Sequence, residues 1–584
     1  MTDANLTATS LLAIDVGSVT TRAFFFDAVE GGYRLVAQGI APTTLEPPFR
    51  DASAGVQLVL DQLHEITGRI FAHADSGIII PTDPEGNGVD AVAVTLSAGA
   101  PLRTMAVGLL EDISVESAQN LLSTLYAKVF DHIGMNDRRK LEERIDAILQ
   151  ARPDLIVIAG GTEGGASKSV SKLIEPIGLA CYLLPEHQRP HILFAGNSVI
   201  ATEVQNDLSG IVPVDIAPNV RPSLESEQLS SAQKQIREMN RLIRVRDNAP
   251  LMELSNWSGG RMMPATQGFA RIVQFFSKYY PPGKGVLGVD LGASSTTIAA
   301  AFSGTLNHRV YSDLGLGSVL PHLLKYTSLG DIARWTQRNV SASEVQAYIQ
   351  QKVLHPSSLP VTAKDNEMEQ ALAREILRAV VRASKTRFPK SAPQAGRGLL
   401  PWFEPVVVSG SVLTNAPTRA QSLLMILDGL ELTGITTVVL DQFNLVSALG
   451  AASELNPLLA VQVIDTGALV NLAVVISPVV QARTDTPVLR VRVTYESGEE
   501  KKLDLNYGNL EKIPLHPGEE AKLSLQPLNR ANIGMGRAGL GGGLKVKGSE
   551  MGIVIDARGR PLHLSSDASR RRESFQKWLK VLES

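Results

Sequence analysis

The spacing of apolar residues divides the 584-residue chain into three blocks. In the first block, short apolar runs between polar or turn residues predict strands, and a three-to-four-residue apolar spacing predicts helices. The predicted strands cover residues 11–15, 22–27, 33–40, 154–159 and 191–195, and the main predicted helices cover 55–72, 114–132 and 136–151. Asn136 and Asp137 are placed to cap the last helix, which Pro153 ends.

The second block follows a proline-containing stretch and combines strands with long helices. Its predicted helices cover residues 223–245, 264–280, the interrupted run 330–388 and 445–455, and its predicted strands cover 285–290, 297–302, 405–409 and 436–441. After residue 456, period-two alternation predicts a β-rich domain closed by a helix over 566–583. The apolar residues of that helix share one face, which we expect to dock on the β-rich domain: Phe575, Trp578, Leu579 and Leu582.

One short motif occurs twice, about half a chain apart. Asp15-Val16-Gly17-Ser18 and Asp290-Leu291-Gly292-Ala293 each end an apolar strand, and in each case hydroxyl residues and a second apolar strand follow. A tight hairpin of this kind presents backbone N–H groups and hydroxyls to an anion, and its Asp can hold a hydrated divalent cation. A single copy is also typical of an ordinary hairpin. The spaced pair therefore indicates two similar halves that hold one phosphate chain.

Composition and charge narrow the classes of partner. The chain is 44% hydrophobic and 20% charged, with a net charge of −3, so we expect neither nucleic acid nor a membrane as a partner. The lone Cys181 lies in an apolar stretch, where we expect it to be buried. One cysteine excludes an intrachain disulfide and fits a reducing cytoplasm, and the polar first ten residues do not predict a signal peptide.

The order of strands and helices, seen twice, resembles the actin, Hsp70 and sugar-kinase superfamily. The resemblance implies an α/β fold of two ribonuclease-H-like domains around a nucleotide cleft, with the β-rich domain added at the C-terminus. It implies ATP or ADP with Mg²⁺ as the ligand. We expect domains over residues 1–205 and 206–442, a helix over 443–456 that returns to the first domain, and the β-rich domain over 457–584.

The superfamily resemblance also gives roles to particular residues. Asp15 and Asp290 would hold Mg²⁺ through water, and Asp15 would be catalytic. The residues that match the two phosphate loops are Gly17, Ser18, Thr20, Thr21, Gly292, Ser294, Ser295 and Thr296. Those that match the adenosine loop are Ser409, Gly410 and Ser411, where small side chains allow the nucleotide to lie close to the backbone.

A glycine-rich segment, Gly160-Gly161-Thr162-Glu163-Gly164-Gly165, is a further candidate. By analogy with the fold, Gly161 and Thr162 would contact phosphate, and Glu163 would orient a catalytic water. The alternative is that Thr162 caps the following helix while Glu163 complements its dipole. Because Thr and Glu are common at helix starts, the residue types favour the capping interpretation.

A closer resemblance covers most of residues 10–455. The segments that carry it are Asp15–Arg22, 158–165, 256–264, 288–297, 354–379 and 409–417. Together they resemble the glutamate-mutase accessory protein family, called MutL or GlmL and unrelated to the mismatch-repair protein of similar name. The resemblance implies an ATP-binding, chaperone-like partner of an adenosylcobalamin-dependent mutase.

The sequence departs from this family pattern at positions that bear on ATP hydrolysis. Thr297 stands where an acidic residue is expected, and Ser409 and Ser411 flank Gly410 where the family has glycines. Loss of a carboxylate near the cation weakens metal binding and the positioning of water. The function expected is therefore a nucleotide-binding accessory protein with weak ATPase activity or none. The alternatives are a non-hydrolysing actin-like scaffold, forming homo-oligomers or filaments, and a small-molecule kinase.

Overall fold

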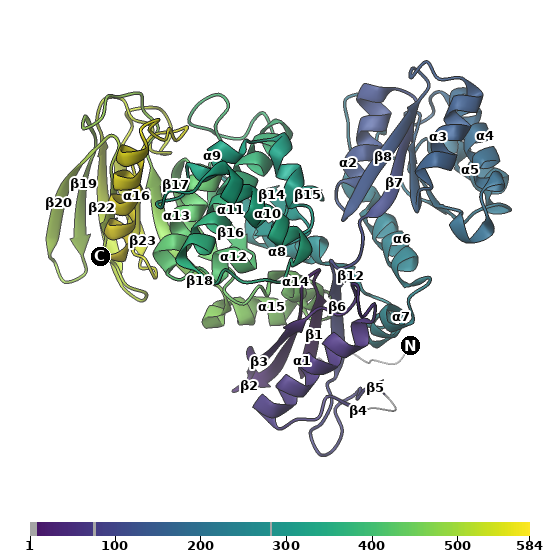
Figure 1. Cartoon of the computed structure of the whole chain (residues 1–584), viewed down its shortest axis with the longest axis horizontal. Helices are drawn as coiled ribbons and strands as arrows, with labels where there is room; N and C mark the ends of the chain where they lie inside the picture. Colours follow the sequence, from purple (N-terminus) through teal and green to yellow (C-terminus); the bar gives the residue numbers. More distant parts are fainter. Residues whose placement is uncertain (1–8, 74–76, 281–282) are drawn as a thin grey trace. The chain divides into compact units, whose positions relative to one another are not determined.

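The computed structural model describes residues 9–73, 77–280 and 283–584. The described chain forms two compact units (Figure 1). The N-terminal unit contains residues 10–25 and 37–267, and the C-terminal unit contains residues 26–36 and 268–584 together with Thr9. The domain limits expected at residues 205 and 442 stay predictions.

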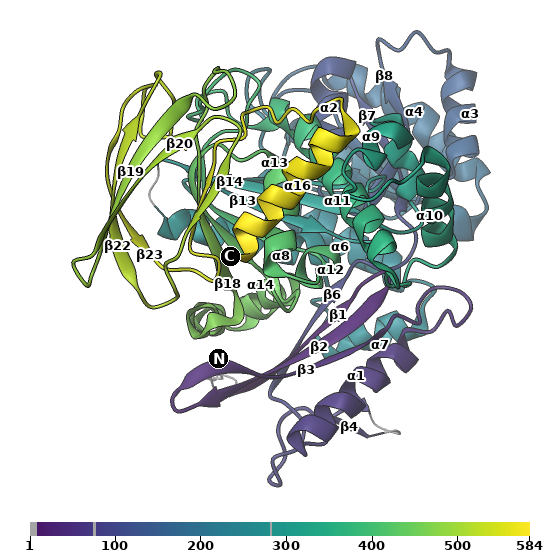
Figure 2. The same ribbon diagram turned by 60° about the vertical axis from the view of Figure 1, so that its left-hand side comes forward.

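The first sheet of the N-terminal unit carries the first Asp-Gly motif. Its strand order is β12-β6-β1-β2-β3, over Met263–Pro264, Ala91–Leu96, Ser10–Val16, Thr20–Val29 and Gly32–Pro42. β6 is parallel to β1 and places Thr95 beside Asp15. Helix α1 (Ala52–Thr67) packs its apolar face on this sheet (Figure 2). It ends before the predicted residue 72 because Gly68 adopts the left-handed conformation, with a φ of 72°.

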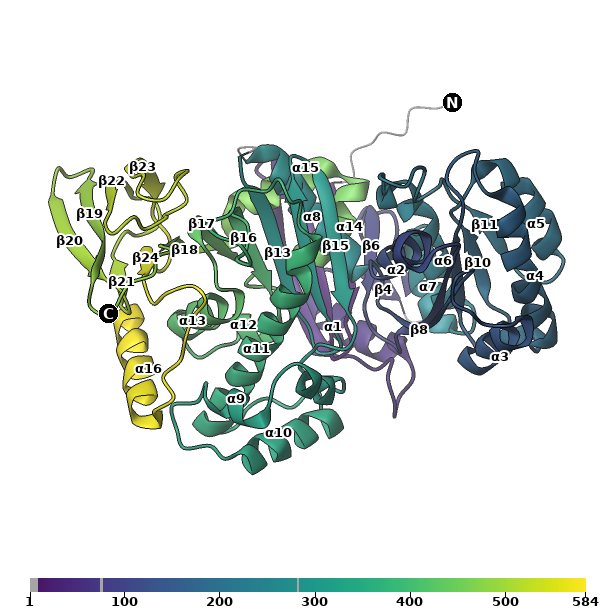
Figure 3. The same ribbon diagram turned by 90° about the horizontal axis from the view of Figure 1, so that it is seen from above.

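A second, fully parallel sheet follows in the same unit. Its strand order is β11-β10-β9-β7-β8, over Val214–Ile216, His191–Phe194, Leu155–Ala159, Leu102–Gly108 and Ala127–Gly134. Figure 3 shows helices on both faces. One face holds α3 (Leu141–Ala151), α4 (Ser167–Leu183) and α5 (Ala201–Ser209), and the other holds α2 (Glu116–Leu122) and α6 (Gln233–Val245).

The parallel sheet differs from the sequence expectation in two ways. Residues 154–159 and 191–195 do form strands, but they pair with β7 and with each other rather than with β1. Residues 127–132, predicted as the end of a helix, belong instead to the edge strand β8 (Ala127–Gly134), where inward and outward residues partly alternate. Asp137 caps no helix, because its carboxylate binds Arg144 and the backbone of Gly134 while α3 begins at Leu141.

The C-terminal unit is built on an eight-stranded sheet. Its first part, β15-β14-β13, is an antiparallel meander over Thr305–Tyr311, Thr296–Phe302 and Gly285–Leu291. β16 (Phe403–Ser409) and β17 (Gly434–Leu440) continue it parallel to β13. Helices α11 (Ala363–Ser384) and α13 (Arg419–Leu430) pack on one face. On the other face lies α8 (Ala265–Tyr279), and a Cβ on Gly288 would meet Val273 and Phe269 of this helix.

The C-terminal strands extend this sheet and add a second one. β18 (Val470–Ser477) pairs with β17, and β24 (Ile553–Asp556) and β21 (Leu510–Ile513) complete the eight strands. The expected antiparallel sheet is also present, in the order β20-β19-β22-β23 over Glu500–Asn506, Pro487–Tyr495, Glu520–Pro527 and Gly542–Lys547. The mixed α/β class and the β-rich C-terminal region are therefore confirmed.

The terminal helix α16 (Ala568–Glu583) docks partly where it was expected to. Its buried Phe575, Trp578 and Leu582 join the core formed by α11, α13 and the eight-stranded sheet. Phe575 makes an edge contact with Trp335, whose ring centroid lies 5.9 Å away. Figure 2 shows α16 beside α13. The apolar stripe was predicted correctly, and its contact with β21 lies in the expected β-rich region. Its contact with the helical layer at α13 was not expected.

Two expectations about composition can be compared with the described residues. Cys181 is fully buried in α4, as expected, and burial raises the pKa of its thiol to about 12. Within residues 9–73, 77–280 and 283–584, no helix is long and apolar enough to cross a membrane.

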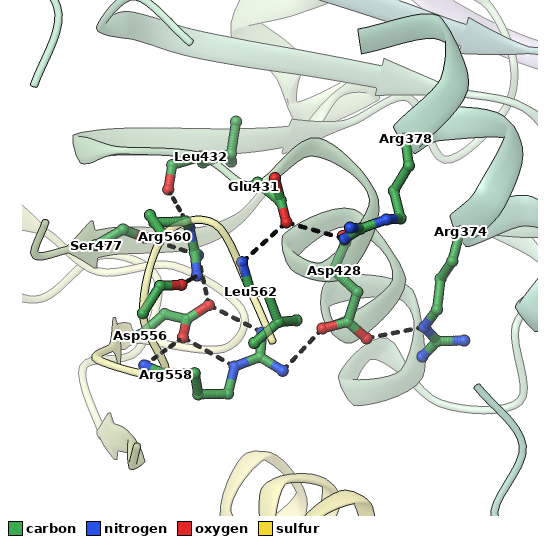
Figure 4. A network of polar contacts seen from close by, with 11 residues as sticks. Arg374, Arg378, Asp428, Glu431, Leu432, Ser477, Asp556, Arg558, Arg560 and Leu562 are labelled. Atoms are coloured by element: carbon green, nitrogen blue, oxygen red, sulfur yellow. Dashed lines mark hydrogen bonds and ion pairs between the residues drawn. The ribbon is translucent and has the colours of Figure 1, made fainter. Parts of the chain in front are cut away.

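A buried ion network joins the end of β24 to the helical layer (Figure 4). The Arg558 guanidinium donates to Asp556 and to Asp428 of α13, each at 2.8 Å. Asp428 also accepts from Arg374 of α11, and Arg560 donates to Asp556 at 2.7 Å. Burial alone would raise the pKa of Asp556, but Arg558 and Arg560 hold it well below its ordinary value. The stability that this carboxylate contributes is therefore present above about pH 4 and is lost as the pH falls further.

We predict that Arg558→Ala strongly destabilises the C-terminal unit, because it leaves Asp428 and Asp556 buried with fewer counter-charges. The expected loss is about 3–5 kcal/mol in the free energy of unfolding. Urea unfolding followed by tryptophan fluorescence measures it. The control is Arg490→Ala, which removes a solvent-exposed ion pair with Asp504 and should leave the midpoint unchanged. Equal midpoints for the two variants would contradict the prediction.

Candidate functional site

The two Asp-Gly hairpins close in the same way. The amide of Gly17 donates to the carbonyl of Thr20 at 3.1 Å, and the amide of Gly292 donates to the carbonyl of Ser295 at 3.0 Å. A Cβ on Gly17 would lie 2.7 Å from the Thr20 oxygen, and one on Gly292 would lie 3.0 Å from the Ser295 oxygen. A side chain is therefore excluded at Gly17 and crowded at Gly292, so each turn can bring its backbone close to a ligand.

Each hairpin tip is also held by the segment that follows the third strand of its meander. In the N-terminal unit, the Thr43 hydroxyl donates to the Gly17 carbonyl at 2.6 Å, and the Thr43 amide donates to Val19 at 2.9 Å. In the C-terminal unit, the Leu316 amide donates to the Gly292 carbonyl at 3.1 Å. The sequence motif did not reveal these supports, because they lie about 25 residues away and have no common residue type.

Asp15 is buried at the end of β1. Its carboxylate accepts a hydrogen bond of 2.7 Å from the Thr95 hydroxyl of β6 and lies 3.7 Å from an Arg22 nitrogen. Loss of solvent raises the pKa of Asp15, and the attraction of Arg22 and the Thr95 bond only partly oppose this. A carboxylate held in this way is fixed in position and acts most readily on a neighbouring water or proton.

The predicted hydroxyl ligands divide into two groups. Thr21 and Thr296 are buried, and their hydroxyls bond inside the protein, to the Thr43 hydroxyl and to the Leu314 carbonyl. Ser294 is also buried. The side chains that remain partly exposed on the turns are Ser18, Thr20 and Ser295. These three, with the turn amides, are the groups that the two turns present to an anion.

The second hairpin shares its sheet edge with two further polar residues. Asp290 lies opposite Thr297 of β14 and beside Ser409 of β16. The Ser409 hydroxyl donates at 3.0 Å to Asp441, which follows β17. Asp441 is fully buried and accepts the amides of Leu445 and Val446 at the start of α14 (Val446–Leu455).

Asp441 was missed by the sequence reasoning, although it ends an apolar strand just as Asp15 and Asp290 do. With Asn444 it fixes the loop predicted to hold adenosine, because the Gly410 amide donates to the Asn444 side chain at 2.9 Å. Gly410 has a φ of 121°, and a Cβ there would lie 2.3 Å from the Leu291 carbonyl. Ser411 is exposed at the start of the short helix α12 (Ser411–Thr414).

The glycine-rich segment with Glu163 follows β9 of the parallel sheet, whereas Asp15 lies on β1 of the other sheet. Ser198 donates to one Glu163 carboxylate oxygen at 2.6 Å, and Asn219 donates to the other at 2.7 Å. Partial burial acts to raise the pKa of Glu163, but these two bonds hold it below its ordinary value. The capping interpretation of Thr162 is wrong, because α4 begins only at Ser167, after the turn from Thr162 to Gly165.

Among the described residues, no preformed site would bind a metal ion through direct protein ligands. No group of three or more His, Cys, Asp or Glu side chains is arranged to hold an ion there. Each hairpin offers a single Asp with hydroxyl neighbours, a donor set that suits a hydrated cation held through water.

Comparison with known proteins identifies related chains. A model of the family described as MutL protein matches residues 11–467. The chain is also similar to Protein MutL of Clostridium tetanomorphum, with 22% identity over 389 residues that cover 62% of this chain and 76% of the relative. The family match confirms the closer resemblance that the sequence motifs indicated.

Several solved structures are similar over much of the chain but superpose poorly. Nucleotide-free acetone carboxylase is 12% identical and covers 86% of this chain and 81% of its own, with a TM-score of 0.30. A glycerol dehydratase reactivase is 12% identical, covers 72% of this chain and 95% of its own, and has a TM-score of 0.28. TM-scores this low support no conclusion about fold or function.

We predict that Asp441→Ala destabilises the C-terminal unit by about 1–3 kcal/mol, because it leaves the amides of Leu445 and Val446 unpaired in a buried place. Thermal unfolding measures the loss. Asp465→Ala, at an exposed position nearby, is the control and should leave the melting temperature unchanged. Equal melting temperatures for the two variants would show that the buried Asp441 contacts contribute little to the stability of the fold.

Proposed function

The chain belongs to the MutL protein family, and we propose that it is a nucleotide-binding, chaperone-like accessory protein of an adenosylcobalamin-dependent mutase. The observation that carries the nucleotide part of the proposal is the pair of hairpins closed by the same glycine-to-carbonyl bond. The mutase part rests on the family, whose resemblance implies such a partner.

The repeated strand order supports two related nucleotide-binding halves. In β3-β2-β1-β6 and in β15-β14-β13-β16-β17, a three-stranded meander is followed by strands parallel to its first member. We assign these two sheets to the two ribonuclease-H-like domains of an actin-type ATPase. The hairpin of each sheet would bind nucleotide phosphate, and the loop of Ser409, Gly410 and Ser411 would lie against adenosine.

The residues of the hairpins divide the work of binding phosphate. The exposed hydroxyls of Ser18, Thr20 and Ser295, with the turn amides, would donate to phosphate oxygens. Asp15 and Asp290 would hold the water shell of a magnesium ion. When bound, that ion neutralises phosphate charge. Asp15 fits this indirect role, because its carboxylate is already occupied by Thr95 and Arg22.

We expect ATP hydrolysis to be weak because of the groups that lie at the second hairpin. Thr297, opposite Asp290, carries no charge, and the Ser409 hydroxyl is bound to Asp441. Asp15, whose carboxylate is fixed by Thr95 and Arg22, would then be the group that orients a water. The same neutral Thr297 favours a second function, a non-hydrolysing actin-like scaffold, for which nucleotide-dependent self-assembly is the distinguishing property.

A nucleotide can act on a partner only if the bound and free states of the protein differ in affinity for that partner. The accessory role therefore requires coupling between nucleotide binding and mutase binding. By thermodynamic linkage, the mutase must change the affinity for nucleotide by the same factor.

We predict that Asp15→Asn weakens Mg-ATP binding roughly 10- to 100-fold, because a neutral amide cannot hold the hydrated cation as a carboxylate does. Isothermal titration of the full chain with Mg-ATP measures the affinity. Asp61→Asn, at an exposed position on α1, is the matched control and should bind as the wild type does. An unchanged affinity in Asp15→Asn would remove Asp15 from the site.

A second prediction concerns the partner. The affinity for an adenosylcobalamin-dependent mutase should differ between Mg-ATP and Mg-ADP by about 5- to 150-fold, the usual range of allosteric coupling. Surface plasmon resonance with the immobilised mutase measures it, and Asp15→Asn should lose the difference while keeping its fold. Equal affinity in both nucleotides would contradict the accessory role, and polymerisation with Mg-ATP would favour the scaffold instead.

A further inference from the structure

The parallel sheet of the N-terminal unit has its own ligand-binding topology. Numbered in chain order from β7, its strands lie side by side in the order 2-1-3-4-5. The chain leaves β7 toward the face covered by α2, and it leaves β9 toward the opposite face covered by α4 (Figure 3). In doubly wound sheets of this kind, ligands bind outside the carboxyl ends of the strands at this point of divergence. Here the point lies between Gly108 and Ala159, which are paired in register.

At the ends of three strands along this edge, a glycine stands where a larger side chain would be crowded by neighbouring atoms. A Cβ on Gly108 would lie 2.6 Å from the Val115 amide, and one on Gly196, after β10, would lie 2.4 Å from the Gly160 carbonyl. Gly161, which follows β9, has a φ of 76° and a place for its Cβ only 3.1 Å from Asn197. The glycine-rich loop therefore brings bare backbone to the edge, and the amides of Gly161 and Thr162 donate to no acceptor within the described chain.

Glu163 holds this loop in place rather than facing a ligand. Both of its carboxylate oxygens are engaged, by Ser198 and by Asn219, and its amide donates to the Pro222 carbonyl at 3.0 Å. The Asn219 side chain also donates to the Gly161 carbonyl at 3.0 Å. Glu163 is thus a positioning residue that connects the ends of β9 and β10 with the segment after β11.

Arg221 supplies the observation that points to a ligand. It lies between Val220, whose amide donates to the Ala195 carbonyl after β10, and Pro222, which accepts from Glu163. Its Nε is buried without an acceptor, and Arg221 forms no ion pair with any described residue. Arg221 as a whole is half-buried, and a guanidinium without a carboxylate partner attracts an anion that supplies the missing counter-charge.

We propose that this edge is a second ligand site, separate from the two hairpins, which binds the phosphate or carboxylate end of a small molecule. Arg221 and the amides of Gly161 and Thr162 hold the anionic group. Leu110 after β7 and Val199 after β10, whose side chains are 44% and 69% exposed, provide apolar surface at the same edge for the rest of the ligand. Gly161, Thr162 and Glu163 then serve this site and not the ATP phosphates.

Hydrogen exchange of the full chain tests the proposal with two probes, pyrophosphate for the phosphate class and succinate for the carboxylate class. One of them should slow exchange in peptides that cover residues 160–165 and 219–222, and the probe that acts identifies the class. Arg221→Ala should weaken that protection at least tenfold in probe concentration, and Arg221→Lys should lose less because it keeps the charge. The control Arg152→Ala removes an exposed arginine after α3, at the opposite end of β9.

Protection that is absent with both probes, or equal in Arg221→Ala and Arg152→Ala, overturns the proposal. The nucleotide function is tested independently in the same experiment. Asp15→Asn should lose Mg-ATP protection at residues 15–21 and keep the probe's protection at 160–165, so that either site can fail without the other.

Discussion

Everything proposed for nucleotide binding depends on one backbone hydrogen bond that occurs twice, from a glycine amide to the carbonyl three residues later. The bond closes each hairpin so tightly that a Cβ on Gly17 or Gly292 would press against the accepting carbonyl. It also turns the remaining amides and the hydroxyls of Ser18 and Ser295 outward. Thr43 and Leu316 hold the two tips from the next segment of each meander, so the same constraint is met by different residues.

The C-terminal strands β18, β24 and β21 continue the eight-stranded sheet of the C-terminal unit. β18 pairs directly with β17, and the buried charges of Asp428, Asp556 and Arg558 connect the last strand of the sheet to the helical layer. Removing one member of this set leaves the others buried with fewer counter-charges, which is why the ion network binds the last strand of the sheet to α13.

The two hairpins could be predicted from the local sequence, because an apolar strand that ends in Asp-x-Gly is recognisable within ten residues. The sheet to which a strand belongs could not be predicted. Residues 155–159 form a fully buried strand, and a continuous apolar run contains no signal that distinguishes pairing with residues 11–15 from pairing with residues 102–108. The hydrogen bonds by which Thr43 supports the first hairpin join residues that are distant in the sequence, so no sequence pattern indicates them. Asp441 could have been found, since it follows an apolar strand as Asp15 and Asp290 do.

The proposed nucleotide function requires that both Asp-Gly hairpins bind the phosphates of Mg-ATP. Hydrogen exchange of the full chain, measured with increasing Mg-ATP, tests it most directly because each hairpin is followed separately. We expect the amides of residues 17–20 and those of residues 292–295 both to become protected as Mg-ATP is added. Protection of only one hairpin, or of neither, would contradict this.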